Sequence, residues 1–248
     1  AQNRKGERLV VKANSRTAIA EMFRLLRTNL NYLSSGEAKQ CILITSSMSG
    51  EGKTFIAVNL SMSLALTNKR VIVLGMDLRK PKLSEYLTSN LDHESLGVSS
   101  YLIGESTIEE IIQPSQVHSN LFLIPSGPIP PNPAELLSGP KTAQMFDYLK
   151  THFDYVIIDT APVGLVADAF LLTPFTDLSL FAVRYAKTEQ AMLTRLDEMR
   201  RAGKLEKPAI VLNGIKEGKG QGYGYGYGYG YGYGYYEEDR KKKWRLFK

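Results

Sequence analysis

The segment 41–66 constrains the fold more strongly than any other part of the sequence. An apolar run at 41–46 is followed by Ser47-Met-Ser-Gly-Glu-Gly-Lys-Thr54 and then by residues that favour a helix. The backbone N–H groups of such a loop and the N-terminus of the following helix form a concave anion site. Gly50 and Gly52 let phosphate oxygens approach the backbone closely. This strand–loop–helix unit predicts a phosphate-binding loop.

Residue types within the loop predict individual tasks. Lys53 is expected to reach the β- and γ-phosphates of a nucleoside triphosphate, and the Thr54 hydroxyl is expected to bind Mg²⁺. Ser47 stands where the general pattern has its first glycine. We predict ATP and Mg²⁺ as cofactors. The predicted nucleotide-binding residues are Ser49, Gly50, Glu51, Gly52, Lys53, Thr54, Phe55 and Asn213.

Strand-like and helix-like segments alternate along the chain. The strand-like apolar runs are 41–46, 70–76, 121–125, 155–159, 178–183 and 209–213. The helix-like segments are 17–33, 53–66, 107–112, 133–137, 142–152, 166–172 and 188–201. This order predicts an α/β fold of the P-loop NTPase kind, with a mainly parallel central sheet flanked by helices. A length of 248 residues fits one large domain.

Two aspartates end strand-like runs. Asp159 follows Val156-Ile-Ile, and Asp77 follows the run at 70–76. Ligand crevices in parallel sheets form at the carboxyl ends of the strands, so both acids are expected beside the phosphate loop. The alternative for Asp159 is a helix cap or a turn residue, and the alternative for Asp77 is a turn residue. We predict Lys53, Asp77 and Asp159 as catalytic residues and Thr54, Asp77 and Asp159 as metal ligands.

The composition changes sharply near the C-terminus. Glycine and tyrosine alternate over 222–235, and a stretch with half glycine and no branched aliphatic residues cannot offset its ordering entropy by burial. We predict a flexible tail at 218–248, a folded domain at 17–217 and an N-terminal juxtamembrane-like segment at 1–16. The basic, aromatic end at 240–248 is either a solvated terminus or a contact with an anionic membrane surface.

Charge and cysteine content narrow the function classes. The net charge of +6 comes partly from the tail, and the basic residues form no stripe typical of nucleic-acid binding, so no nucleic-acid partner is expected. No run reaches about 18 apolar residues, so no membrane span is predicted. Cys41 is the only cysteine, which indicates a reducing, cytosolic setting. The chain does not begin with methionine, and we expect it to be a segment of a longer polypeptide.

The phosphate loop, the Asp77 segment and the Asp159 segment, in this order, resemble the bacterial tyrosine kinases called BY-kinases. These are the cytoplasmic kinase domains of polysaccharide co-polymerases of the Wzc and CapB type. In that family 47–54 corresponds to the Walker A motif, 71–79 to Walker A′ and 159–162 to Walker B. The resemblance implies an ATP- and Mg²⁺-dependent protein-tyrosine autokinase that regulates exopolysaccharide and capsule synthesis and export.

Gly75 departs from the family pattern. BY-kinases usually carry two Walker A′ aspartates one residue apart, and Gly75 occupies the first of these positions. The residue that activates the tyrosine hydroxyl is therefore left open. Asp77 could take both tasks, or metal-bound water and positioning could suffice, because phosphoryl transfer depends mainly on positioning and charge neutralisation.

The resemblance also implies partners. Glu21, Arg24 and Arg27 match a family pattern for self-association into a ring, with phosphorylation between subunits; without the family, they would read as a solvated helix face. Further implied partners are a membrane activator domain, upstream or on another chain, and a cognate tyrosine phosphatase. The implied location is the cytoplasmic face of the bacterial inner membrane. The implied phosphoacceptors are Tyr223, Tyr225, Tyr227, Tyr229, Tyr231, Tyr233, Tyr235 and Tyr236.

Other functions fit parts of the same pattern. A Par/Min-type ATPase switch would dimerise on ATP without phosphorylating tyrosine. Such ATPases carry a signature lysine early in the phosphate loop, where this chain has Met48. A nucleotide-binding scaffold is a further alternative, and the tail could also be a sticky segment or a plain linker. The two aspartates and the tyrosine-rich tail favour the kinase.

Overall fold

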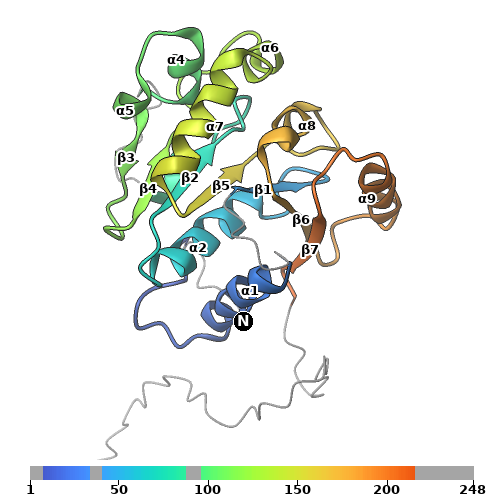
Figure 1. Ribbon diagram of the computed structural model, residues 1–248. Coiled ribbons are helices and arrows are strands. Elements are labelled where there is room, and N and C mark those ends of the chain that lie inside the picture. The colour runs from blue at the N-terminus through green and yellow to red at the C-terminus, as the bar shows by residue number, and fades with distance from the viewer. Residues whose placement is uncertain (1–7, 34–40, 88–95, 216–248) are drawn as a thin grey trace, which may run out of the picture.

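The structure, a computed structural model, describes residues 8–33, 41–87 and 96–215. Its centre is a seven-stranded sheet in the order β3-β4-β2-β5-β1-β6-β7, with helices on both faces (Figure 1). The strands are β1 (Cys41–Ser46), β2 (Val71–Gly75), β3 (Gln113–Pro114), β4 (Leu121–Ile124), β5 (Tyr155–Asp159), β6 (Leu178–Arg184) and β7 (Pro208–Asn213). The predicted α/β fold with a mainly parallel sheet is confirmed.

The helices follow the alternation expected from the sequence. They are α1 (Ala18–Leu33), α2 (Lys53–Ala65), α3 (Ser84–Leu87), α4 (Val98–Ile103), α5 (Ile108–Ile111), α6 (Pro133–Leu137), α7 (Pro140–His152), α8 (Asp168–Leu172) and α9 (Ala191–Arg201), with a 3₁₀ turn at Thr173–Phe175. α7 begins two residues earlier than predicted because Pro140 stands in its first turn, where its missing N–H has no cost.

Three short elements, β3, α3 and α4, lie outside the predicted pattern. β3 is a two-residue strand that pairs antiparallel with β4, whereas β4, β2, β5, β1, β6 and β7 pair in parallel. α4 has six residues and ends at Gly104, whose left-handed φ of 92° stops the helix. β3, α3 and α4 have two, four and six residues, and segments of this length give only a weak hydrophobic period.

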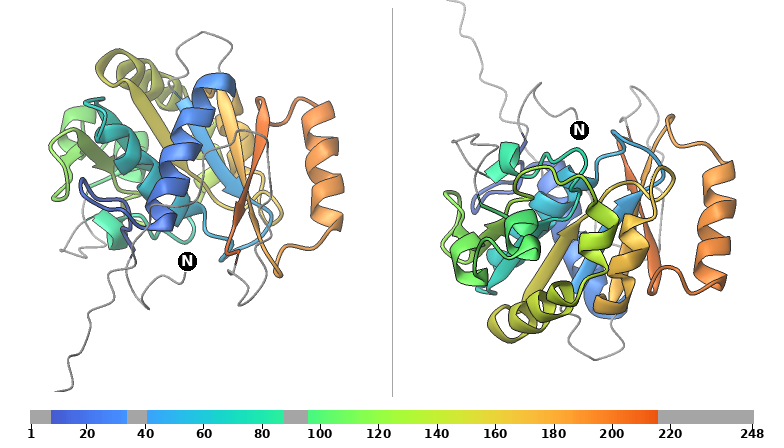
Figure 2. Two further views of the ribbon diagram at one scale, coloured as in Figure 1. Left: turned by 90° about the horizontal axis from the view of Figure 1, so that it is seen from below. Right: turned by 90° about the horizontal axis from the view of Figure 1, so that it is seen from above.

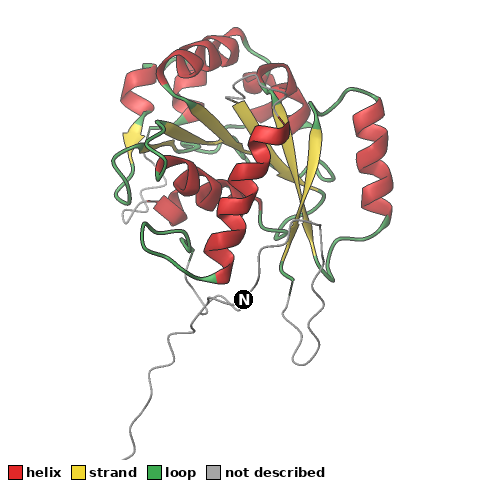
Figure 3. Ribbon diagram, turned by 60° about the horizontal axis from the view of Figure 1, so that its bottom comes forward, coloured by secondary structure: helices red, strands yellow, loops and turns green. Residues whose placement is uncertain are grey.

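Helices cover both faces of the sheet (Figure 3), and the sheet separates two layers of apolar side chains. Leu43 of β1 faces the layer that includes Phe146 and Leu149 of α7, while its neighbours Ile42 and Ile44 face the layer beneath α1 and α2. Side chains of a strand alternate between faces, so each buried strand contributes to both layers. This two-sided burial accounts for the continuous apolar runs in the sequence.

The segment before α1 packs against α2. Val10 and Val11 are buried in the layer beneath α2, and their N–H groups donate to Asn59 Oδ1 at 2.8 and 3.1 Å. Asn59 Nδ2 in turn donates to the carbonyl of Arg8 at 3.0 Å. Residues 8–11 therefore pack with the same core as α2, although the boundary between 1–16 and 17–217 stays a prediction.

The carboxyl ends of β2, β5, β1, β6 and β7 lie at one edge of the sheet because these strands are parallel. The loops that follow them bring distant parts of the sequence together, and α9 lies beside the β6–β7 side of the sheet (Figure 2). In the described ranges, no helix combines the length and apolar character needed to cross a membrane.

Candidate nucleotide site

The loop between β1 and α2 depends on two glycines. Gly50 has a φ of 81° and Gly52 a φ of 106°, a left-handed conformation that glycine adopts without steric cost. A Cβ atom on Gly52 would also lie 2.1 Å from Asn213 Nδ2. The loop therefore turns sharply just before Lys53, the first residue of α2, and directs its backbone toward the helix N-terminus.

Glu51 holds the inside of this loop together. Its buried carboxylate accepts hydrogen bonds from Ser47 Oγ at 2.8 and 3.0 Å, from the Met48 N–H at 2.7 Å and from Thr188 Oγ1. Burial acts to raise the pKa of Glu51, but the bonds from Met48, Thr188 and Ser47 outweigh it and leave the pKa below its ordinary value. Glu51 is therefore ionised, and its hydrogen bonds stabilise the phosphate loop from inside.

Replacing Glu51 by glutamine should destabilise the protein by about 1–3 kcal/mol, because an amide group offers a donor where a buried carboxylate oxygen accepts. The lowered pKa means that this stabilisation is present above the ordinary carboxyl pKa and is lost as the pH falls through the lower folded value. Thermal unfolding at neutral pH measures the change. An unchanged melting temperature would contradict this role; Glu189→Gln, at an exposed position nearby, is the control.

Three side chains donate hydrogen bonds to backbone carbonyls of the phosphate loop. They come from β6, from the loop after β6 and from β7. Arg184 Nη1 donates to the Gly50 carbonyl at 2.8 Å, Lys187 Nζ to the Ser49 carbonyl at 2.9 Å, and Asn213 Nδ2 to the Glu51 carbonyl at 2.9 Å. Asn213 is among the residues predicted from the sequence, whereas Arg184, Lys187 and Thr188 are not. The sequence signal that could have identified these three residues is their position at the carboxyl end of a strand-like run, where ligand crevices of parallel sheets form.

Asp159 lies at the end of β5, buried beside the start of α2. Burial raises its pKa from 3.8 to about 7, although a hydrogen bond from Thr54 and the charge of Lys53 lower it; Asp77 adds a smaller increase. Its Oδ1 atom has no hydrogen-bond partner in the described part of the chain. The structure therefore brings Lys53, Thr54, Asp77 and Asp159 close enough to interact.

This group of residues fits a magnesium ion that is bound together with phosphate oxygens. The Asp159 carboxylate interacts with the Thr54 hydroxyl, and its buried Oδ1 has no hydrogen-bond partner among the described residues. Mg²⁺ usually takes one or two carboxylates, waters and substrate phosphates in proteins. Over the described residues, no cluster of three or more His, Cys, Asp or Glu side chains could hold a metal by itself. The chemistry of the site thus suits a metal–triphosphate complex.

Asp77 lies in the loop after β2, and its Oδ1 accepts hydrogen bonds from the N–H groups of Arg79 and Lys80 at 3.3 and 3.0 Å. Gly75, at the end of β2, is paired in register with Asp159. Ser126 Oγ donates to the Gly75 carbonyl at 2.7 Å, and a Cβ on Gly75 would lie 2.6 Å from that hydroxyl. In this conformation the position of the missing aspartate has no room for a side chain.

Phe55 points into a packed interface. Its ring contacts the ring of Phe23 from α1, with centroids 5.7 Å apart and an edge-to-face angle of 63°. This contact accounts for an aromatic residue near the start of α2. A nucleotide contact of Phe55 stays a prediction.

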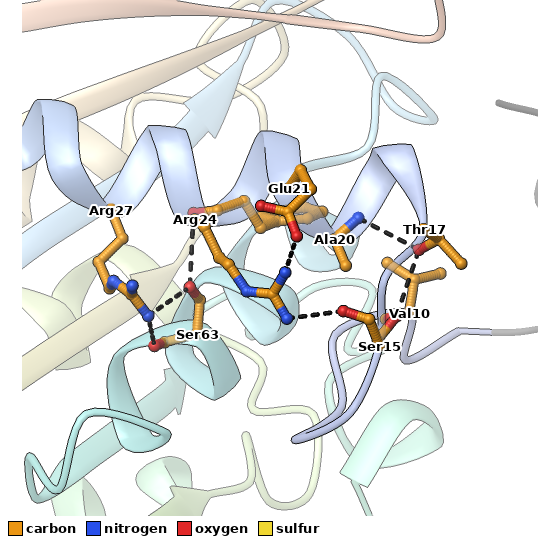
Figure 4. A network of polar contacts seen from close by, with 9 residues as sticks. Val10, Ser15, Thr17, Ala20, Glu21, Arg24, Arg27 and Ser63 are labelled. Carbon is orange, nitrogen blue, oxygen red and sulfur yellow. Dashed lines mark hydrogen bonds and ion pairs between the residues drawn. The ribbon is translucent and has the colours of Figure 1, made fainter. Parts of the chain in front are cut away.

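Glu21, Arg24 and Arg27 of α1 form contacts within the chain (Figure 4). Arg24 binds Glu21 and donates to the Ser15 carbonyl at 2.6 Å. Arg27 donates to the carbonyl of Ser63 in α2, also at 2.6 Å. The arginines therefore connect α1 to its preceding segment and to the phosphate-loop helix. Their role in self-association stays a prediction, and the eight tail tyrosines lie outside the described residues.

Comparison with known proteins adds a family. The model of the AAA domain family matches residues 39–174. The tyrosine-protein kinase YwqD of Bacillus subtilis is 34% identical over 200 residues, covering 81% of this chain and 83% of that kinase. The tyrosine-protein kinase ptk of Acinetobacter johnsonii is 34% identical over 209 residues, 84% of this chain, but the match spans only 28% of ptk.

Solved structures agree with these relatives. The chimerical protein CapA2B2 superposes with a TM-score of 0.79 at 31% identity, covering 86% of this chain and 92% of that one. The kinase domain of the Escherichia coli tyrosine kinase ETK gives a TM-score of 0.78 at 28% identity, covering 92% and 88%. MinD of Pyrococcus horikoshii, solved with Mg-ADP, shares only the fold, at 22% identity, a TM-score of 0.56 and coverages of 70% and 69%. The chain belongs to the bacterial tyrosine kinases, the BY-kinase family.

Proposed function

We propose that the chain transfers the γ-phosphoryl group of Mg-ATP to tyrosines of its own C-terminal cluster. The observation that carries this proposal is the meeting of Lys53, Thr54 and Asp77, from separate segments, around the buried Asp159 carboxylate, whose Oδ1 has no hydrogen-bond partner among the described residues. Lys53 would bind the β- and γ-phosphates, and Thr54, Asp77 and Asp159 would hold the metal. The bound metal ion supplies neutralisation of phosphate charge.

The chain's own groups then position the acceptor. In the proposed mechanism the tyrosine oxygen attacks the γ-phosphorus in line, the bond from the γ-phosphorus to the bridging oxygen breaks, and ADP leaves. The hydroxyl proton passes to Asp77, the carboxylate in the loop where Gly75 replaces the other family acid. The loop braced by Glu51 keeps its N–H groups directed at the phosphates, which requires no reorganisation during transfer.

Acceptors, partners and location complete the proposal. The acceptors are the tyrosines at 223–236, on a flexible tail at 218–248 that follows a kinase domain at 17–217. The domain works at the cytoplasmic face of the inner membrane with a membrane activator and a phosphatase, and it regulates export of a surface polysaccharide. The similarity to the tyrosine-protein kinase ptk and to the chimerical protein CapA2B2 supports this setting.

Mass spectrometry of tail peptides tests the proposal. Dephosphorylated protein, supplied with an activator segment and Mg-ATP, should gain phosphate on tyrosines within 223–236. A wild-type chain that stays unmodified under these conditions would exclude the autokinase. Hydrolysis of ATP without phosphotyrosine would instead favour the Par/Min-type switch.

Self-association through α1 gives a separate prediction. Arginine forks suit contacts with a carboxylate of another subunit, and phosphates on the tail would add about −1.5 to −2 charges each and repel neighbouring subunits. Dephosphorylated protein with Mg-ATP should therefore form a ring that an Arg24→Ala/Arg27→Ala variant, or full phosphorylation, converts to smaller species in light scattering.

The matched control for this experiment is Arg200→Ala/Arg201→Ala, which removes two exposed arginines from α9. Because Arg27 also binds Ser63 of the same chain, circular dichroism must first show that the α1 variant is folded. Identical oligomers for wild type, phosphorylated protein and α1 variant would reject this role of α1.

A further inference from the structure

Arg79 and Asp168 form an ion pair between two loops of the site. Arg79 Nε lies 2.7 Å from Asp168 Oδ2, and Arg79 Nη2 lies 3.0 Å from Asp168 Oδ1, so the guanidinium and the carboxylate meet as two parallel forks. The Asp168 side chain is only 3% exposed, whereas that of Arg79 is 41% exposed. A buried carboxylate needs such a partner because it has lost its water.

This pair closes a short structural unit around Asp77. On one side of Asp77, the Met76 N–H donates to the carbonyl of Asp159 at 2.8 Å. On the other side, Arg79 is held by Asp168, the first residue of α8, which follows the loop after β5. Asp77 therefore lies between two connections that both lead to the β5 side of the site.

The same unit fixes the Asp77 carboxylate itself. Its Oδ1 accepts from the N–H groups of Arg79 and Lys80, so the backbone that orients the carboxylate belongs to the residue that carries the guanidinium. Asp168 raises the pKa of Arg79 through these side-chain bonds, and Asp77 adds a smaller Coulomb effect in the same direction. Asp77, Arg79 and Asp168 thus form one cluster of interacting charged groups.

We propose that Arg79 and Asp168 are positioning residues, which hold the loop 76–80 so that Asp77 faces the same metal–phosphate complex as Asp159. This inference rests on the proposed function for the nature of that complex. The pair acts through Asp77 and does not itself hold the metal. Gly75 makes such positioning more important here, because Asp77 is the only carboxylate that this chain has at 75–77.

The expected consequence is a specific loss of metal binding. Residues that orient metal-binding groups typically change metal affinity or activity by about 10–100-fold when they are replaced. The phosphate loop is held by hydrogen bonds of Glu51, Arg184 and Asn213, and none of these bonds involves Arg79 or Asp168. Nucleotide binding without metal should therefore survive loss of the Arg79–Asp168 pair.

Binding of a fluorescent ADP analogue to the full chain, in EDTA and across a Mg²⁺ titration, separates these effects. Arg79→Lys keeps the charge but loses the fork, and Asp168→Asn keeps the shape but loses the charge. Both should require about tenfold more Mg²⁺ than wild type, while affinity in EDTA changes by less than about twofold. The matched control is Asp197→Asn, which breaks an exposed aspartate–arginine pair on α9 and should leave both values unchanged.

A double variant covers the case in which a single change exposes a buried charge. Arg79→Met/Asp168→Asn removes both charges. It should show the same Mg²⁺ requirement as the two single variants, because each of the three variants loses the Arg79–Asp168 ion pair. The proposal would be overturned if folded variants needed no more Mg²⁺ than the wild type. It would also be overturned if they lost as much affinity for the ADP analogue in EDTA as in Mg²⁺. The assay needs no phosphoryl transfer, so a wild type without phosphotyrosine would reject the kinase function and leave this test intact.

Discussion

Replacing Lys53 by methionine is expected to lower tail phosphotyrosine by at least ~100-fold under conditions in which the wild type modifies itself. Lys53 is the first residue of α2 and is almost fully buried beside Asp159, and we propose that its ammonium binds the β- and γ-phosphates. Methionine fills a similar volume without charge. Quantitative mass spectrometry of tail peptides, after incubation with Mg-ATP and an activator segment, measures the effect.

The control for this experiment is Lys69→Met. Lys69 is half exposed and pairs with Asp154 before β5, at the opposite edge of the sheet from the phosphate loop. It should retain wild-type phosphorylation. If Lys53→Met and Lys69→Met behave alike, the assigned task of Lys53 is wrong, whichever tyrosines are modified.

Replacing Asp159 by asparagine should produce two opposite effects. Autophosphorylation should fall by at least ~100-fold, because neutral asparagine removes a metal-binding carboxylate whose charge stabilisation is worth several kcal/mol. The metal-free protein, however, should become more stable than wild type at alkaline pH. The ionised Asp159 carboxylate is unfavourable for folding because it is buried, but the reaction needs its charge to bind the metal. Functional sites commonly contain such groups.

The pKa of Asp159 gives the sign of the stability effect. It is raised from 3.8 to about 7, mainly by burial, with Thr54 and Lys53 opposing and Asp77 contributing. The folded protein therefore holds this proton more tightly than the unfolded chain. The resulting stabilisation is complete below the ordinary carboxyl pKa and is lost as the pH rises through about 7.

Thermal unfolding in EDTA, from about pH 5.5 to about pH 8, tests this sign. Wild-type protein should lose stability over this range, relative to Asp159→Asn, whereas the Asp197→Asn control should follow the wild type. The Asp197 carboxylate is a suitable control because arginine hydrogen bonds lower its pKa, away from this range. Parallel curves for wild type and Asp159→Asn would show that Asp159 is ionised throughout.

Much of the fold was predictable from the sequence because its signals are local. Each buried parallel strand requires a continuous apolar run, and β1, β2, β4, β5, β6 and β7 all match such runs to within a few residues. The phosphate loop was equally visible, because left-handed turns at Gly50 and Gly52 need glycine whatever surrounds them. The carboxyl ends of parallel strands then predicted that Asp77 and Asp159 would approach Lys53 and Thr54.

The connections that hold this site in place were decided only by the tertiary structure. Arg79 binds Asp168, 89 residues away, Arg184 binds the Gly50 carbonyl across 134 residues, and Thr188 binds Glu51 across 137. Such pairs follow from the order and register of the strands, and no spacing in the sequence encodes them. Local periodicity and backbone preference are properties of neighbouring residues, so the sequence alone determined the elements and the loop. Which charged side chains meet depends on how the sheet brings distant loops to one edge, and that required the folded chain.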